Sequence, residues 1–164
     1  ARLRVLAQPD YSDVPGGRGP FYRSALVARA GAAVAPPQTP GPALPALAGR
    51  FAFNARDSLS GFLALAEDAG DPAGWAAGLV ETGSHRASLC AVAQGQADLA
   101  AIDARTWALA LRHEACAGRL VVIGWTGERP GLPFVTARGT DPALVADLRA
   151  ALTAMGAHPA TEGA

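Results

Sequence analysis

The chain contains no lysine, so all 14 of its basic residues are arginines, and 14 acidic residues balance them. The formal net charge is therefore zero, and the arginines are scattered along the chain. Binding to nucleic acid or to an anionic membrane surface needs a basic patch. We therefore predict no nucleic-acid partner. Any bound anion must rely on helix ends, hydroxyl groups, histidine and arginine.

Long apolar runs and cysteines are also scarce. No apolar run reaches the roughly 20 residues of a membrane-spanning helix, so we predict no membrane insertion. Cys90 and Cys116 are the only cysteines. They are too few for a disulfide framework and lack metal-ligand spacing, so we expect small apolar fillers, with one disulfide in an oxidising compartment left open. We predict no metal site and no cofactor, because no cluster of metal ligands is visible.

The periodicity of the chain predicts alternating strands and helices. Strands are expected at 3–7, 21–29, 50–54, 79–82, 98–102, 120–123 and 132–136, and helices at 59–70, 84–94, 103–118 and 141–156, with a short helical piece near Trp75. Loops are expected at 8–20 and at 31–45, which carries five prolines, and a frayed tail after 156. The alternation between 50 and 124 predicts an α/β fold: a mostly parallel sheet with helices on both faces.

Two turns that lead from a strand into a helix carry hydroxyl groups and small residues. The first contains Ser58, Ser60 and Gly61, and the second contains Ser84 and His85. The first turn of a helix exposes N–H groups without intrahelical acceptors and a partial positive charge, which together suit an oxyanion. The alternative is that these residues only cap their helices or lie on a solvated surface.

Asp103 follows the strand expected at 98–102, so it should lie at the same edge of the sheet as the two turns. It is either a helix cap or a counter-ion for a cationic group of the ligand, such as an amine. Tyr22 is either a wall of the ligand pocket or a core residue.

A hydrolase that uses Ser58 or Ser60 with His85 is a third interpretation. The sequence has no Gly-x-Ser-x-Gly elbow, and no acidic residue is recognisable as the group that would orient the histidine. We therefore predict no catalytic residues and no enzymatic activity.

Several motifs occur in an order that resembles a known family. They are Phe51-Ala-Phe-Asn54 through Ser58-Leu-Ser-Gly61, Thr82-Gly-Ser-His85, the segment 91–103 with its Ala97-Asp98 pair, and Leu132-Pro-Phe134. Upstream, Pro9-Asp10-Tyr11 and Phe21-Tyr-Arg-Ser24 extend the likeness. The chain resembles the phosphate/phosphonate-type solute-binding proteins of ABC transporters, which have the type II periplasmic-binding-protein fold. The family's helix start often reads Ser-Thr-Ser-Gly, and here Leu59 replaces one hydroxyl contact.

The resemblance implies that Ser58, Ser60, Gly61, Ser84 and His85 contact an oxyanion. It also implies that Asp103 meets a ligand amine, and that Tyr22 lies at the edge of the pocket. It divides the chain into a hinge segment with crossing strands (1–30), a second α/β lobe (31–126), and a return strand with a C-terminal helix that belongs to the first lobe (127–164). The family's N-terminal segment, which builds most of the first lobe, is absent from this sequence.

The implied function is that of the substrate-binding component of an ABC importer for phosphate, phosphonate or a related oxyanion. Its partners would be a small oxyanion ligand and the transporter permease. Its place would be periplasmic, or extracytoplasmic and tethered to the membrane. The alternative is an intracellular ligand-sensing or cofactor-precursor metabolic protein on the same fold, which leaves a cytoplasmic location open.

Overall fold

The computed structural model describes residues 3–31 and 49–160, and these form parts of two compact units. The first unit combines Ala1–Tyr22 with Arg129–Ala164, and the second unit is Arg23–Glu128. The proline-rich loop expected at 31–45 lies almost entirely outside the described residues.

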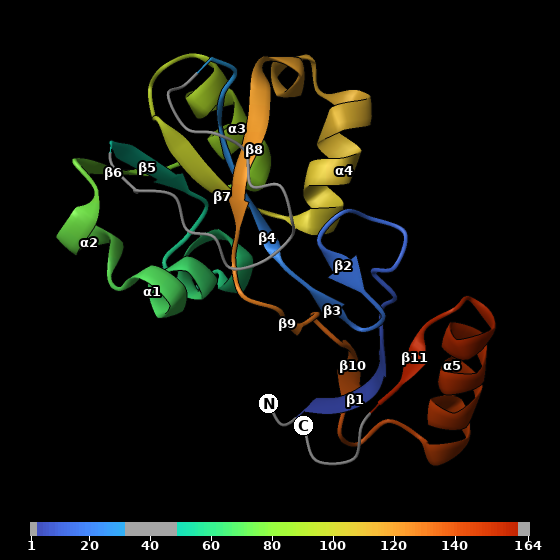
Figure 1. Cartoon of the computed structure of the whole chain (residues 1–164). Coiled ribbons are helices and arrows are strands. Elements are labelled where there is room, and N and C mark those ends of the chain that lie inside the picture. The colour runs from blue at the N-terminus through green and yellow to red at the C-terminus, as the bar shows by residue number, and fades with distance from the viewer. Residues whose placement is uncertain (1–2, 32–48, 161–164) are drawn as a thin grey trace. The chain divides into compact units, whose positions relative to one another are not determined.

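A five-stranded sheet forms the centre of the second unit (Figure 1). Its strands, in spatial order, are β6 (Gly78–Glu81), β5 (Arg50–Phe53), β7 (Leu99–Asp103), β4 (Ser24–Arg29) and β8 (Leu120–Trp125). β5 pairs in parallel with β6 and β7, whereas β4 pairs antiparallel with β7 and β8. Four of the five strands therefore run in one direction, which confirms the mostly parallel sheet.

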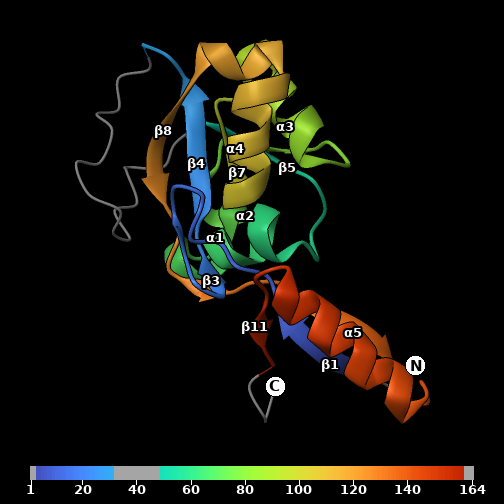
Figure 2. The same ribbon diagram turned by 90° about the vertical axis from the view of Figure 1, so that its right-hand side faces the viewer.

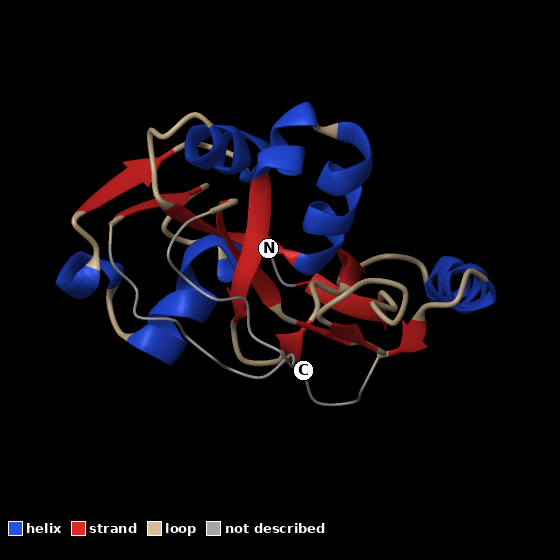
Figure 3. Ribbon diagram, turned by 45° about the horizontal axis from the view of Figure 1, so that its top comes forward, coloured by secondary structure: helices blue, strands red, loops and turns tan. Residues whose placement is uncertain are grey.

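Helices cover both faces of this sheet (Figure 3). They are η1 (Leu59–Leu63, a π-helix), α1 (Ala64–Ala69), α2 (Pro72–Trp75), α3 (His85–Ala93), α4 (Ala104–His113) and η2 (Ala115–Arg119, a 3-10 helix). Alternate residues of a strand point to opposite faces, so buried strands can supply two cores. One core gathers η1 and α1 against four strands: Leu26, Ala28, Phe51, Phe53, Phe62, Leu65, Leu99, Ala101 and Ile123.

The first unit contains two three-stranded sheets. In one, β1 (Leu3–Gln8) lies between β10 (Phe134–Ala137) and β11 (His158–Pro159), and in the other β3 (Phe21–Tyr22) lies between β2 (Gly17–Arg18) and β9 (Arg129–Pro130). Helix α5 (Pro142–Ala154) packs along β1 (Figure 2). Its start follows the sequence pattern, because Asp141 caps the helix and proline takes its first position.

The structure corrects three sequence predictions. The strand expected at 21–29 is divided at Arg23, because β3 pairs within the first unit whereas β4 joins the large sheet. The helix expected at 103–118 ends at His113, where Glu114 takes an extended conformation (φ −115°, ψ 113°) and a 3-10 helix follows. The tail after Gly156 is paired to β1 as β11, instead of frayed.

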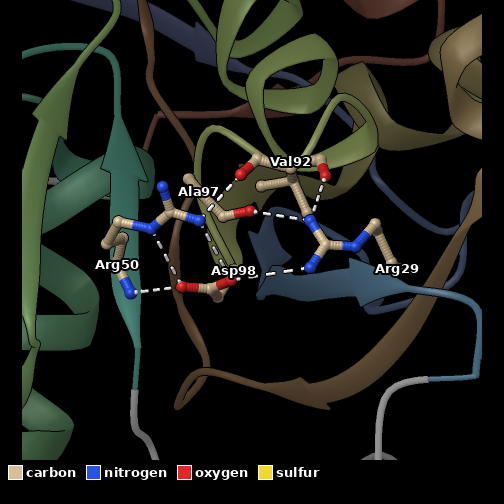
Figure 4. Close-up of polar contacts among 6 residues, drawn as sticks. Arg29, Arg50, Val92, Ala97 and Asp98 are labelled. Carbon is tan, nitrogen blue, oxygen red and sulfur yellow. Dashed lines mark hydrogen bonds and ion pairs between the residues drawn. The ribbon is translucent and has the colours of Figure 1, made fainter.

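A cluster of charged side chains links the amino-terminal ends of β5 and β7 by hydrogen bonds and ion pairs (Figure 4). The Asp98 carboxylate accepts hydrogen bonds from the Arg50 backbone N–H at 2.8 Å and from Arg50 Nε at 3.3 Å, and Arg29 Nη2 lies 3.6 Å away. Arg29 also donates to the Val92 and Ala97 carbonyls at 3.0 and 3.2 Å. The hydrogen bond from the Arg50 backbone is the main reason that the pKa of Asp98 lies below its ordinary value of 3.8.

We expect Asp98→Asn to lower the free energy of unfolding by about 1 kcal/mol near neutral pH, because the partly exposed cluster is screened by solvent. A carboxyl group whose pKa is lowered on folding stabilises the fold above its unfolded pKa, and that contribution is lost as the pH falls through the folded value. The difference between wild type and variant should therefore shrink below about pH 4. Urea denaturation at about pH 7 and about pH 3 measures it. Asp147→Asn, on the exposed surface of α5, is the control; an equal loss there, or a gap that widens in acid, would contradict the assignment.

Within the described ranges 3–31 and 49–160, none of the helices combines the length and the hydropathy of a bilayer-spanning segment.

Candidate functional site

The site lies where three strands of the second unit end. β5, β6 and β7 run parallel, and each is followed by a helix start: η1 at Leu59, α3 at His85 and α4 at Ala104. The carboxyl ends of parallel strands meet at one edge of a sheet. The geometry therefore brings the two serine-bearing turns and Asp103 to the same edge, as the sequence pattern predicts.

Three of the predicted site residues cap these helices. Ser58 Oγ accepts from the Gly61 N–H at 3.1 Å, Ser84 Oγ accepts from the Ala87 N–H at 3.1 Å, and Asp103 Oδ1 accepts from the Thr106 N–H at 2.9 Å. The capping alternative thus describes how these side chains are held. A serine that accepts a backbone hydrogen bond still has its own O–H to donate, so capping leaves Ser58 and Ser84 able to bind an anion.

Ser60 and His85 join the two turns directly. Ser60 Oγ lies 2.9 Å from His85 Nε2, although the two residues are 25 positions apart in the chain. Ser60 comes from the first turn of η1 and His85 is the first residue of α3. The contact shows that the two helix starts lie next to each other, close enough for their side chains to meet.

His85 is held in a state suited to donating one neutral N–H. Burial lowers the pKa of its imidazole below the ordinary value of 6.5, and the nearby Asp103 carboxylate acts in the opposite direction with a smaller effect. Burial therefore favours the uncharged form of the ring. His85 Nδ1 is buried, and among the described residues no hydrogen-bond partner reaches it.

Asn54 lies beside the same helix start, and its place in the sequence predicts no role for it. It follows β5 directly, and its buried Oδ1 atom has no hydrogen-bond partner among the described residues. A Cβ atom placed on Gly61 would overlap that oxygen, so the helix start packs against Asn54 only because residue 61 is glycine. The Asn54 carbonyl also accepts from the Gly83 N–H at 3.0 Å, which ties the first turn to the second.

Arg56 is a second residue that the motifs did not single out. Its guanidinium lies 5.5 Å from the ring centroid of Phe62 and 5.8 Å from that of Phe53. This stacking places a positive charge in the loop that precedes Ser58. The sequence signal for this contact is an arginine that lies between two phenylalanines, Phe53 and Phe62, in one short segment.

Tyr22 belongs to the first unit, whereas the other predicted site residues belong to the second unit. Its side chain is buried and stacks on Tyr11, with ring centroids 5.2 Å apart. Its position at the pocket edge stays a prediction.

In the part of the chain that the structure describes, no three histidine, cysteine, aspartate or glutamate side chains gather in a way that could hold a metal ion. The donors around Ser60 and His85 are hydroxyl, imidazole and amide groups, which can bind an anion by hydrogen bonds alone.

Comparison with solved structures shows the same fold in phosphonate-binding proteins. A binding protein component of an ABC phosphonate transporter from Pseudomonas aeruginosa matches with a TM-score of 0.66 and 23% identity, over 90% of this chain and 49% of its own length. PhnD1 from Prochlorococcus marinus, in complex with methylphosphonate, matches with a TM-score of 0.65 and 21% identity, over 92% and 56%. A Xanthomonas citri protein bound to ATP matches with a TM-score of 0.58 and 16% identity, over 92% and 56%.

The chain thus spans about half the length of these relatives. No curated protein matches it. The family model for the periplasmic substrate-binding protein of phosphonate ABC transporters, however, matches residues 1–164. The chain therefore belongs to the family of periplasmic phosphonate-binding proteins of ABC transporters.

Proposed function

We propose that this chain binds a phosphonate, phosphate or related oxyanion as part of the substrate-binding component of an ABC importer. The observation that carries the proposal is the 2.9 Å contact between Ser60 and His85, which joins two helix starts at one edge of the sheet. Membership of the phosphonate-binding family and the methylphosphonate complex of PhnD1 support it.

The ligand's tetrahedral group would displace the Ser60–His85 contact and accept hydrogen bonds from both side chains. Ser58 and Ser84 would donate their hydroxyl protons while they keep their capping bonds. The first turns of η1 and α3 would add backbone N–H groups and the positive ends of two helices. Gly61 would let the backbone approach the ligand closely.

Asp103 gives the proposal a preference among ligands. A carboxylate near an oxyanion site disfavours a plain anion but attracts a ligand that also carries an amine. Asp103 is close enough to influence the pKa of His85, so it lies near the proposed ligand position. We therefore propose that an aminophosphonate binds more tightly than phosphate.

The ligand would then be delivered to a transporter permease outside the cytoplasm. In two-lobed receptors, closure of the lobes around the ligand supplies contacts from both sides. The second unit would form the second lobe. The first unit would contribute strands and the C-terminal helix to the first lobe. The matching family gives no support to the intracellular alternative.

We also propose that the Ser60–His85 pair is not a hydrolytic centre. A serine nucleophile needs a histidine that a third group orients through Nδ1. Among the described residues, no hydrogen-bond partner reaches His85 Nδ1, and Asp103 uses its Oδ1 to cap α4.

An NMR titration of the 164-residue chain tests the proposal. Methylphosphonate, 2-aminoethylphosphonate and phosphate, added to millimolar concentration, should shift the amide signals of 58–61 and 83–86 in a saturable way. The aminophosphonate should saturate first. Acetamide, a neutral compound of similar size, is the control. Saturable binding elsewhere, or no saturable shift with any of the three anions, would overturn the proposed function.

A further inference from the structure

The two cysteines of the chain meet in the second unit. Cys90 lies in α3 and Cys116 in η2, and their Sγ atoms are 2.9 Å apart although the residues are separated by 26 positions. Both are free thiols in this structure. The contact is part of the packing between α3 and η2, so it is held by two elements of regular structure.

The two sulfur atoms are close enough for a disulfide to form with a small movement. A disulfide bond is about 2.05 Å long, so the Sγ atoms, now 2.9 Å apart, must approach by about 1 Å in total for the bond to form. Cys116 is buried, whereas Cys90 is partly exposed and can be reached by a reagent from solvent. Burial, helped by the Cys90 contact, raises the pKa of the Cys116 thiol to about 11. The partial exposure of Cys90 makes it the thiol that an external reagent meets first.

We propose that Cys90 and Cys116 are a modification site that closes to an intramolecular disulfide in an oxidising compartment. The oxidant is a disulfide donor, such as a thiol–disulfide oxidoreductase or oxidised glutathione. The Cys90 thiolate attacks one donor sulfur and expels the other as a thiolate. Cys116 then loses its proton and attacks Cys90 Sγ, which releases the second donor thiol. The protein loses two electrons and two protons, and the donor takes up both.

The bond would fasten the helix that presents the proposed ligand residue. His85 begins α3 and Cys90 lies five positions further along the same helix. A disulfide between Cys90 and Cys116 would mainly restrict the conformations of the unfolded and partly opened chain. It would change the folded site less. Its formation in the cell rests on the proposed extracytoplasmic function, whereas the reactivity of the pair does not.

The reduced 164-residue protein, incubated with oxidised glutathione at neutral pH, tests the inference. We expect free thiols to fall from two to none, the intact mass to drop by two hydrogens, and the peptides of Cys90 and Cys116 to be linked after proteolysis. The melting temperature of the oxidised form should exceed that of the reduced form by about 5–15 °C. Retention of both thiols, stable glutathione adducts on each, or an oxidised form that melts no higher would overturn it.

Single variants supply the matched controls. Cys90→Ser and Cys116→Ser should each keep one thiol, give no intramolecular link and lose the oxidation-dependent rise in melting temperature. The methylphosphonate titration is repeated in both redox states. Absent ligand binding with a normally formed disulfide would count against the proposed function alone. Normal ligand binding without a disulfide would count against this inference alone.

Discussion

Replacing His85 with alanine is expected to weaken methylphosphonate binding by about 10- to 150-fold, because one hydrogen bond to a charged group contributes about 1.5–3 kcal/mol. Ser60→Ala should have an effect of similar size, since both side chains would turn toward the same ligand oxygen atoms. The melting temperature should fall by no more than about 4 °C, which corresponds to the loss of the single 2.9 Å contact between them. NMR titration gives the affinities, and circular dichroism gives the melting temperatures.

A double-mutant cycle separates the ligand's contacts from the contact between the two residues. If Ser60 and His85 act on the ligand together, the double variant should lose less affinity than the sum of the two single losses. His85→Asn, which keeps an N–H donor, should recover part of the affinity. His113→Ala, at the exposed end of α4, is the matched histidine control. A large fall in melting temperature with unchanged affinity would show that His85 only holds the two turns together.

The helix starts and strands that carry the site could be predicted from the sequence, because they depend on residues that are close together in the chain. Asp103 and Ser84 directly precede apolar helix patterns, and both are N-caps in the structure. The apolar run 120–123 predicts a strand in the sheet, and β8 begins there at Leu120. The sheet edge then follows from chain direction alone, since strands that alternate with helices run parallel.

Side-chain contacts between segments that are distant in the chain cannot be predicted from the sequence alone. Nothing in the spacing of Ser60 and His85 says that their side chains meet, because the contact depends on the order of strands in the sheet. The buried Asn54 oxygen depends on the close packing of Gly61 against it. The pairing of Cys90 with Cys116 was open for the same reason, since two segments from different elements must first pack together.

The break at Arg23 illustrates a different limit. The apolar and aromatic pattern over 21–29 predicts one strand, yet β3 and β4 belong to different sheets. Thr126 binds both residues at this break: its Oγ1 accepts from the Ser24 N–H at 2.8 Å, and its carbonyl accepts from Arg23 Nη1 at 3.1 Å. Strand propensity describes a segment but not the partner to which it pairs, so a change of sheet in mid-pattern leaves no sequence signal.

Gly61→Ala is expected to abolish measurable methylphosphonate binding and to lower the melting temperature by about 3–10 °C. The added Cβ atom would overlap Asn54 Oδ1 and lie 3.1 Å from Ser58 Oγ, so either the helix start or the buried Asn54 side chain must move. Overpacking of this kind costs about 1–3 kcal/mol. Displacing the helix start would also move Ser58 and Ser60 away from the proposed ligand position.

Two further variants identify the overlap as the cause. Gly74→Ala in α2 is the matched control, because a Cβ atom there meets nothing within 4 Å and a helical alanine should be neutral or slightly stabilising. Adding Asn54→Ala to Gly61→Ala removes Asn54 Oδ1, the atom that the new Cβ atom overlaps. The double variant should therefore regain most of the lost melting temperature. If Gly61→Ala keeps wild-type affinity and stability, the first turn of η1 tolerates a side chain and the proposed close approach of the ligand to its backbone is wrong. If the double variant regains stability but not affinity, the Cβ atom at position 61 itself keeps the ligand away from the backbone.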